Sequence, residues 1–296
     1  MKFFSYLSSP RELRFFCRAE SMAAGRCATF IKTMTKKILL LFVILFLNYN
    51  SFSQSDYFLG KRTYCDMPNQ SDSRELYKLG IDCINQNLYI GGANQVFQKL
   101  IKQDSLFCDA YFFAGYTFRL SNMNKEAFAM YYMADSLSQN KSIEFKQNLA
   151  MMSVSIGNMR FARKKYLEMT KYFPTSPEGY YGIAITSPEI GDADFGLKNI
   201  NIAEEKYVLE NKDVQFIKAI LLNLTGNYED SIKYFEKVQS EFSKNDYFNG
   251  NYALSLYEIA IKSNDDKLLK KAKKHYNKVK DKSNLTDYIK SKFEKP

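Results

Sequence analysis

The residue types that most often carry out acid–base chemistry are rare in this chain and lie far apart. The 296 residues include one histidine, His275, in a Lys-rich segment. General acid–base catalysis commonly uses a histidine, but a position among lysines on a helix favours a surface or interface role. The adjacent carboxylates Glu204-Glu205 point to different sides of a helix, and Asp265-Asp266 stand in a turn where Asp caps backbone N–H groups. Both pairs are therefore expected to be solvated.

Two other patterns match ligand-binding loops only in part. Asp192, Asp194 and Gly196 begin like a calcium loop, but the third oxygen ligand and the distal Glu do not follow at the required spacing. A turn with a helix N-cap accounts for them. Gly91-Gly92 lacks the Lys-Ser/Thr that follows in a phosphate-binding loop. The sequence thus predicts a protein that is not an enzyme, with no catalytic residues, no metal site and no cofactor.

Three cysteines follow residue 53, namely Cys65, Cys83 and Cys108. Export would place them in an oxidising compartment, where one pair is expected to form a disulfide and leave one thiol over. The sequence does not choose the pair. The alternative is that they are small buried residues at helix interfaces, above all Cys83. None has the spacing of metal ligands.

The N-terminal region contains the three parts of a secretory signal. Lys36 and Lys37 precede an unbroken apolar run from Ile38 to Leu47, and small residues follow at Ser51 to Ser53. Because ten apolar residues are too few for a bilayer, which takes about 20, we predict a signal peptide over residues 34–53 and a mature start at Gln54. The protein is accordingly expected in the periplasm or cell envelope of a bacterium.

Two flanking segments complete this end of the chain. Residues 1–33 show neither a helical nor a strand period, and we interpret Met34 as the true start of translation. The alternative is an unusually long basic leader. Residues 54–73 are expected to form a polar lead-in to the helical part.

Charge is unevenly distributed along the chain. Removal of residues 1–53 takes away eight basic and two acidic residues, which lowers the formal net charge from +10 to +4. Residues 262–296 hold twelve lysines against five acidic residues, so the body is mildly acidic and the tail basic. A cationic run attracts anionic lipid or glycan, but more often it is the solvated face of an end helix.

The remaining sequence is helical in pattern, with regularly spaced breaks. Asn122, Gly157, Gly191 and Gly226 stand 35, 34 and 35 residues apart, and each ends a helical run. Gly adopts the left-handed backbone conformation of a tight turn freely, and Asn tolerates it. Further breaks are expected at Gly91-Gly92, Asn140, Pro174 to Pro177 and Asn249-Gly250.

Helix packing is also visible in the spacing after each stop. Five residues on comes a small residue, and four residues further a large one. Small residues let two helices approach closely, and large residues fill the space one turn away. The pairs are Ala127 with Tyr131, Ala162 with Tyr166, Gly196 with Ile200, and Ser231 with Phe235.

This pattern resembles the tetratricopeptide repeat, a pair of helices about 34 residues long. The match is best in residues 108–139, through Tyr111, Ala114, Gly115, Phe118, Ala127, Tyr131 and Ala134. Residues 143–174 match through Leu149, Ala150, Gly157, Ala162, Tyr166 and Pro174; residues 177–208 through Tyr180, Ile183, Ala184, Gly191 and Ala203; residues 212–243 through Ala219, Gly226, Tyr228, Phe235 and Val238. Lys146, Ser153, Gln215 and Lys218 depart from it, standing where the family prefers large or apolar residues.

The resemblance covers residues 74–282, with looser repeats at both ends. It implies an all-α fold, a right-handed α-solenoid of about six antiparallel helix hairpins. The amphipathic segment 283–296 is expected to be a capping helix that shields the last hairpin, or alternatively to lie in the groove of the solenoid.

In this family the first helix of each pair lines the concave surface. The resemblance therefore implies a partner-binding strip just beyond the packing positions. Its residues are Phe112, Tyr116, Arg119, Gln147, Met151, Val154, Tyr181, Ile185, Phe216, Ile220 and Asn223. Exposed apolar strips mark partner sites. The alternatives are a register one residue away, or a strip covered by residues 55–70 or by the last helix.

These observations predict a non-catalytic scaffold that binds a peptide or helix of another protein along its concave face. Aromatic anchors would provide affinity, and Arg119, Gln147 and Asn223 would fix the register. The alternative is an envelope-surface adaptor held to anionic lipid or glycan through its Lys-rich region at residues 267–282. An exported protein is not expected to bind nucleic acid, and nothing in the sequence sets the oligomeric state.

Overall fold

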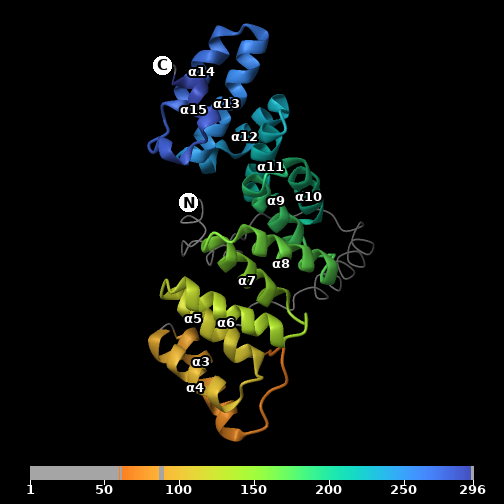
Figure 1. Cartoon of the computed structure of the whole chain (residues 1–296), viewed down its shortest axis with the longest axis vertical. Coiled ribbons are helices and arrows are strands. Elements are labelled where there is room, and N and C mark those ends of the chain that lie inside the picture. Colours follow the sequence, from red (N-terminus) through yellow and green to blue (C-terminus); the bar gives the residue numbers. More distant parts are fainter. Residues whose placement is uncertain (1–59, 61, 87–89, 295–296) are drawn as a thin grey trace, which may run out of the picture. The chain divides into compact units, whose positions relative to one another are not determined.

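The computed structural model describes residues 60, 62–86 and 90–294 (Figure 1). The predicted extension 1–33, the signal peptide 34–53 and the first residues of the lead-in lie outside the described residues. The described part is all-α, as predicted, with thirteen α-helices, one 3-10 turn and no strand. The chain divides at Ser121 and Asn122 into two compact units.

Among the described residues, the first unit contains three helices, and the second contains the other ten. In the first unit they are α3 (Ser71–Asn85), α4 (Ile90–Gln103) and α5 (Cys108–Leu120). In the second they are α6 (Asn124–Leu137), α7 (Ile143–Ser155), α8 (Met159–Tyr172), α9 (Glu178–Ile190), α10 (Ala193–Lys206), α11 (Lys212–Leu224), α12 (Tyr228–Phe242), α13 (Asp246–Ser263), α14 (Asp266–Tyr276) and α15 (Asp287–Phe293), with the 3-10 turn η2 (Lys282–Asn284).

The helices of the second unit form successive pairs. Four pairs pack within it: α7 with α8, α9 with α10, α11 with α12, and α13 with α14. Their first helices begin at residues 143, 178, 212 and 246, which confirms the predicted period. The first helices also contact one another from pair to pair. The two helices of the second predicted repeat, α5 and α6, fall on either side of the boundary between the units.

The helix stops have the predicted backbone conformation. Asn122 has φ 59°, and Gly157, Gly191 and Gly226 have φ 81°, 85° and 77°. A Cβ atom added to any of these three glycines would meet nothing within 4 Å. The conformation itself, rather than crowding, therefore selects glycine there.

The predicted small and large packing residues are all buried. At Gly196 an added Cβ would lie 2.5 Å from the side chain of Ser187 and 2.9 Å from Leu221, so α10 approaches its neighbours as closely as only glycine permits. The confirmed set is Ala127, Tyr131, Ala162, Tyr166, Gly196, Ile200, Ser231 and Phe235.

Two predicted breaks are wrong. Helix α13 runs straight through Asn249-Gly250, and the glycine there serves packing, because the side chain of Leu285 occupies the space where a Cβ of residue 250 would be. Gly91-Gly92 lies in the first turn of α4, which begins at Ile90. The breaks at Asn140 and at Pro174 to Pro177 are confirmed, between α6 and α7 and between α8 and α9.

The residues that depart from the repeat pattern make polar contacts, and all of them except the half-buried Lys218 are buried. Lys146 Nζ lies 2.9 Å from Asp135 Oδ1 and 2.9 Å from Glu168 Oε2, and Lys165 pairs with the same two carboxylates. The Ser153 hydroxyl donates to the carbonyl of Leu149 on its own helix. Charge pairing thus replaces apolar packing at residue 146.

The C-terminal segment packs on the last hairpin. The Phe293 ring stacks on Tyr276 of α14 with centroids 4.4 Å apart, and it meets Tyr257 of α13 edge-on. Leu285 and Ile289 are buried beside them. In the described part of the chain, no helix has both the length and the apolar character needed to cross a membrane.

Candidate functional site

The structure buries four residues of the predicted strip in the second unit, which corrects the expectation that they face solvent. Phe216 stacks on Phe242 with centroids 4.4 Å apart, and Ile220 and Val154 are also buried. Asn223 is buried too, with its Nδ2 donating to the carbonyl of Asn251 at 2.7 Å.

The reason lies in the surroundings of α11. This helix contacts α9, α10, α12 and α13, and its sequence is apolar on nearly every side. A helix of that kind is a core element. The sequence of α11 therefore does not show which of its apolar residues pack in the core and which face solvent.

The strip residues of the first unit stand separately on α5. Phe112 is fully buried and packs edge-on against Phe113, which also contradicts the expected exposure. Tyr116 and Arg119 are half-buried, and the guanidinium group lies 5.2 Å from the centre of the Tyr116 ring.

Four predicted strip residues remain at the surface of the second unit. Gln147 and Met151 on α7 and Tyr181 and Ile185 on α9 are all half-buried. We call these four residues the first-helix face. Helices α7 and α9 contact each other as well as their partner helices, and Gln147 of α7 donates a hydrogen bond to Glu178 of α9.

A carboxylate that the sequence did not single out lies at one end of this face. Glu178, the first residue of α9, accepts a hydrogen bond from Gln147 Nε2 at 3.0 Å and another from the Tyr207 hydroxyl at 2.9 Å. Asp213, in the first turn of α11, is close enough to the phenol of Tyr181 to affect its ionisation. We call these five residues the Glu178 site.

The electrostatics of the Glu178 site disfavour its own negative charges. Burial raises the pKa of Glu178, although the Tyr207 hydrogen bond opposes the shift. Asp213 is an exposed residue, but partial desolvation of its carboxyl and the neighbouring Glu241 raise its pKa. Burial and Asp213 also raise the pKa of Tyr181 well above its ordinary value. Among the described residues, no Lys or Arg forms an ion pair with Glu178 or Asp213.

The loop beside the Glu178 site exposes two apolar side chains. Tyr207 turns its hydroxyl toward Glu178, whereas the next two residues, Val208 and Leu209, are 97% and 81% exposed. Asn211 then caps α11 by accepting from the N–H groups of Asp213 and Val214. The loop is therefore fixed at both ends while its apolar tip faces solvent.

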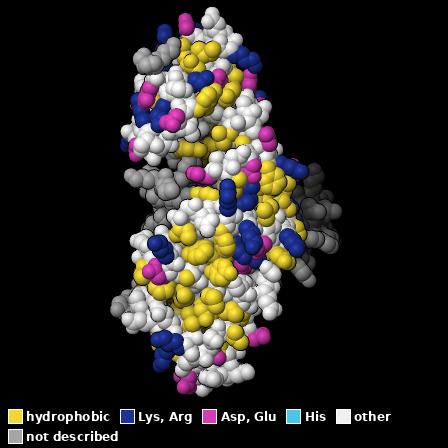
Figure 2. All heavy atoms as spheres, viewed as in Figure 1, with side chains coloured by type: hydrophobic (Ala, Val, Ile, Leu, Met, Phe, Trp, Pro, Cys, Tyr) yellow, Lys and Arg dark blue, Asp and Glu magenta, His cyan; other side chains and the backbone are white. Residues whose placement is uncertain are grey.

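Other surfaces of the second unit are apolar as well. Figure 2 shows hydrophobic side chains beside Lys and Arg where α8 and α10 lie. Leu167 and Phe195 are among the exposed residues of these second helices. Exposed apolar area alone therefore does not distinguish the first-helix face.

The acidic residues examined in the sequence have structural contacts. The Asp192 carboxylate pairs with Arg163 at 2.6 Å and does not cap α10, which corrects the N-cap interpretation. Glu204 pairs with Lys218 at 2.6 Å and is not simply solvated. Asp265 does cap α14, as predicted, by accepting from the backbone N–H groups of residues 267 and 268.

His275 is an interface residue between α13 and α14. It is 4% exposed, and its Nδ1 lies 2.9 Å from Asn249 Oδ1. The Asn249 amide nitrogen donates to two backbone carbonyls, so Nδ1 carries the proton that its oxygen accepts. Burial, reinforced by Lys278, Lys271 and Lys274, lowers the pKa of His275 to about 4.

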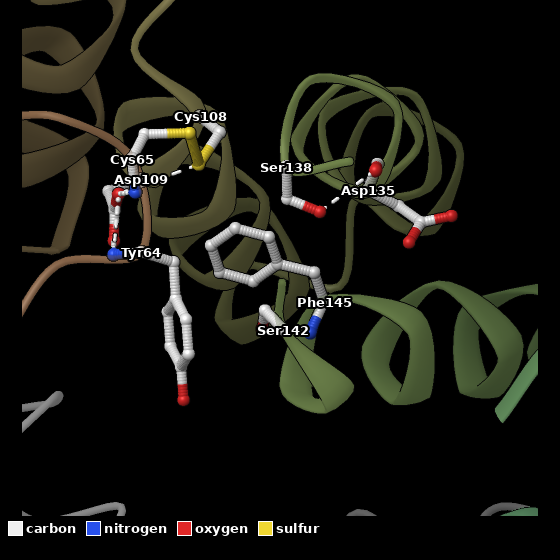
Figure 3. The surroundings of a disulfide bond; sticks show 8 residues. All are labelled: Tyr64, Cys65, Cys108, Asp109, Asp135, Ser138, Ser142 and Phe145. Atoms are coloured by element: carbon white, nitrogen blue, oxygen red, sulfur yellow. Dashed lines mark hydrogen bonds between the residues drawn. A yellow bond between two sulfur atoms is a disulfide. The ribbon is translucent and has the colours of Figure 1, made fainter. Parts of the chain in front are cut away.

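The disulfide joins Cys65 to Cys108 and leaves Cys83 as a free thiol (Figure 3). Asp109 accepts from the backbone N–H groups of Tyr64 and Cys65, so the lead-in segment is held to α5 by a covalent bond and by a carboxylate. Cys65, Cys108 and Asp109 form the one group of three metal-donor side chains in the described residues. Its sulfur atoms are bonded to each other and unavailable as thiolate ligands.

The Lys-rich C-terminal region is partly neutralised. Lys271 pairs with Glu236 at 2.9 Å and Lys282 with Glu294 at 3.3 Å. Four lysines of α14 are exposed and have no ion pair among the described residues. They are Lys267, Lys270, Lys273 and Lys274.

Sequence reasoning missed Glu178, Tyr207 and Asp213. Glu178 and Asp213 occupy the first turns of α9 and α11, where an acidic residue ordinarily stabilises the helix dipole. Tyr207 lies in a loop outside the repeat pattern. No signal in the sequence separates these three from ordinary helix-end and loop residues.

Solved structures of other proteins support the fold, whereas comparisons of sequence give no match. No protein-family model matches the chain, and no curated protein matches it in sequence. A tetratricopeptide repeat protein from Parabacteroides merdae is 15% identical, with a TM-score of 0.52, and the match covers 76% of this chain and 98% of that one.

Two further solved structures agree. The Pseudomonas aeruginosa protein PilF is 13% identical, with a TM-score of 0.54, over 70% of this chain and 91% of that one. YrrB, described as a tetratricopeptide repeat protein with an unusual peptide-binding site, is 15% identical, with a TM-score of 0.50, over 62% and 92%. At such identities the likeness concerns the fold. The paired helices, their period of 34 to 35 residues and these structural matches together show that the chain has the tetratricopeptide repeat fold.

Proposed function

We propose that this protein is a non-catalytic scaffold that binds a segment of another protein along the first-helix face of its second unit. The observation that carries the proposal is the half-buried row of Gln147, Met151, Tyr181 and Ile185 on two helices in contact. A row of this kind offers apolar anchors with one hydrogen-bonding group, as peptide-binding grooves do. That YrrB is described as having a peptide-binding site supports the same use of the fold.

We also propose that the protein acts in the cell envelope after export. The basic, apolar and small-residue parts of segment 34–53 support this location. The bond between Cys65 and Cys108 supports it independently, because disulfides persist mainly in oxidising compartments. N-terminal sequencing of the protein recovered from the periplasm would test it, with Gln54 expected as the first residue. Recovery of an uncleaved chain from the cytoplasm would contradict the proposal.

The binding function is tested by capture from an envelope extract. The double variant Met151→Glu/Ile185→Glu places two charges on the first-helix face. The matched control Leu167→Glu/Phe195→Glu places the same charges on exposed positions of α8 and α10. We expect the first variant to lose a partner that the wild type and the control retain. Equal capture by all three proteins, with unchanged helicity, would contradict the proposal.

A second candidate function rests on the exposed lysines of α14. The cluster Lys267, Lys270, Lys273 and Lys274 would attach the protein to anionic lipid or glycan by charge. Such binding weakens steeply with ionic strength, whereas binding to an apolar face does not. Sedimentation with vesicles of anionic and of neutral lipid, at low and high salt, distinguishes the two functions.

A further inference from the structure

We infer that helices α6 and α8 of the second unit form a docking surface for the face of an anionic lipid membrane. Eight exposed residues make up this surface, which we call the α6–α8 face. They are Lys125, Tyr132 and Met133 on α6, and Arg160, Lys164, Leu167, Lys171 and Tyr172 on α8. The α6–α8 face shares no residue with the first-helix face, so the two surfaces can be tested independently.

The exposed residues of α8 follow one line along the helix. Arg160, Lys164, Leu167 and Lys171 are spaced four, three and four residues apart, which places their side chains on the same side. The leucine is 43% exposed. Glu168, the one acidic residue of α8, lies off this line and pairs with two lysines. The line is therefore a ridge of three cations around an apolar side chain, without an anion.

The cations of this ridge are not matched by acidic groups. Arg160, Lys164 and Lys171 form no ion pair with any described carboxylate, although Arg160 shares a surface hollow with Glu189. On α6 the exposed Glu126 stands next to Lys125, so the positive charge of the α6–α8 face comes mainly from α8.

The outer side of another second helix, α12, is different. Its exposed charges are paired, with Asp230 bound to Lys233 and Glu236 bound to Lys271. Charges that are matched within the chain have little attraction left for a partner. A ridge of unmatched cations creates a positive field, which a surface of opposite charge complements.

Exposed apolar side chains lie among these cations. Tyr132 and Met133 are 45% and 36% exposed, and Tyr172 is 45% exposed. The Tyr132 ring belongs to a cluster with Phe128 and Phe161 that joins α6 to α8, with ring centres 5.6 to 6.4 Å apart. Figure 2 shows the resulting mixture of hydrophobic and basic side chains where α8 lies. The face is therefore amphipathic as well as basic.

This combination fits a membrane surface better than it fits a peptide. A peptide binds in a groove or along a strand edge, and a ridge on one helix is neither. An anionic membrane attracts each lysine or arginine near it, leucine enters the acyl boundary, and tyrosine rings settle at the level of the headgroups. Helix α14 has more unpaired lysines, but none of its large hydrophobic residues is exposed.

Sedimentation with lipid vesicles tests the charged part of this surface. The vesicles contain phosphatidylglycerol and phosphatidylcholine in equal parts, or phosphatidylcholine alone. The chain from Gln54 onward is used, because it contains every described residue and lacks the apolar segment Ile38 to Leu47. Circular dichroism checks that each variant keeps its helicity.

We expect the wild type to sediment with the anionic vesicles and not with the neutral ones. Lys164→Gln/Lys171→Gln should bind about 10- to 30-fold more weakly, because each lysine near an anionic surface contributes about five-fold. The matched control is Lys237→Gln/Lys244→Gln, which removes two exposed lysines that form no ion pair with any described residue. The control should bind as the wild type does.

A tryptophan reporter tests the apolar part. The chain contains no tryptophan, so a single one reports only on its own position. In Leu167→Trp the emission should shift to shorter wavelength with anionic vesicles and be quenched by brominated acyl chains. Leu209→Trp places the reporter on the loop after α10, where the leucine is 81% exposed. Its emission should not change.

The capture experiment keeps the lipid and protein partners apart. Leu167→Glu/Phe195→Glu should lose the vesicles while still capturing the protein partner of the first-helix face. Vesicle binding that survives in Lys164→Gln/Lys171→Gln and disappears in Lys270→Gln/Lys274→Gln would place lipid binding on α14 and overturn the inference. Equal binding to neutral vesicles, no binding to either kind, or an unshifted Leu167→Trp spectrum would overturn it as well.

Discussion

Lys146 and Asp135 form an ion pair, Nζ to Oδ1 at 2.9 Å, in which the side chains are only 2% and 3% exposed. Lys165 and Glu168 complete a closed ring of two cations and two anions that links α6, α7 and α8. Burial opposes the charge of Glu168, but hydrogen bonds from Lys165 and Lys146 outweigh it and lower the pKa of that carboxyl. The ring is thus balanced only while all four members are present.

We therefore expect Lys146→Met to destabilise the protein strongly, because it leaves the carboxylates of Asp135 and Glu168 to share the single cation of Lys165. The cost should be about 3 to 5 kcal/mol of unfolding free energy, measured by denaturant titration. Lys233→Met is the matched control, because Lys233 and Asp230 form an exposed pair and exposed ion pairs contribute little to stability. Similar losses for the two variants would show that the buried ring contributes no more than a surface pair.

The loss of stability caused by a substitution at a helix stop should depend on the backbone conformation there rather than on the space around the side chain. Gly191 has φ 85°, and its surroundings are open. Gly191→Ala should cost about 1 kcal/mol, and Gly191→Asn should cost less, because Asn tolerates the left-handed region. Thermal unfolding of both variants provides the comparison. An alanine variant as stable as the wild type would mean that the turn can relax out of this conformation.

Acid should loosen the α13–α14 interface through His275. The folded-state pKa is about 4 and the ordinary value is 6.5, so the unfolded chain takes up a proton first as the pH falls. The stability from a neutral His275 is therefore complete above about pH 6.5 and is lost as the pH falls toward 4. A shift of this size corresponds to about 3 kcal/mol.

The histidine prediction is checked with His275→Gln, which has no titratable group. The difference in unfolding free energy between wild type and variant should shrink as the pH is lowered from 7 toward 4. A difference that stays constant over this range would show that His275 is not the group responsible.

Reduction of the disulfide should release the lead-in segment from α5. The bond closes a sequence separation of 43 residues, for which chain entropy predicts about 4 kcal/mol. We expect Cys65→Ser to lower the melting temperature to that of the reduced wild type, and to be insensitive to reductant. Cys83→Ser, which removes the free thiol, should retain the sensitivity to reductant. Loss of that sensitivity in Cys83→Ser instead would assign the bridge to another pair.

The negative charge of Glu178, which has no ion pair among the described residues, should lower the unfolding free energy of the protein even when no partner is bound. Because burial raises the pKa of Glu178 in the folded protein above its ordinary value of 4.5, the ionised form is penalised at neutral pH. We expect Glu178→Gln to be at least as stable as the wild type at pH 7. Any gain in unfolding free energy over the wild type should disappear below about pH 4.5, where the wild-type carboxyl is protonated in the folded and the unfolded state. A clear loss of stability at pH 7 would indicate a cation that already pairs with Glu178.

The sequence alone determined the helical repeat because its signals are local. A left-handed stop such as Gly191 and a small residue one helix turn from a large one, such as Ala162 and Tyr166, act within a few residues along the chain. Such signals set where helices end and which side of each helix packs. The polar lead-in, the repeats and the final amphipathic segment follow from the same patterns.

Only the tertiary structure decided which apolar faces are covered and which polar groups meet. Phe216 is buried between Phe242 of its own repeat and Phe248 of the next one, and glycine at position 250 of α13 leaves room for Leu285. Glu178 meets a side chain 31 residues before it and another 29 residues after it. Contacts at such separations depend on how neighbouring repeats stack, and the period of one repeat does not contain that information.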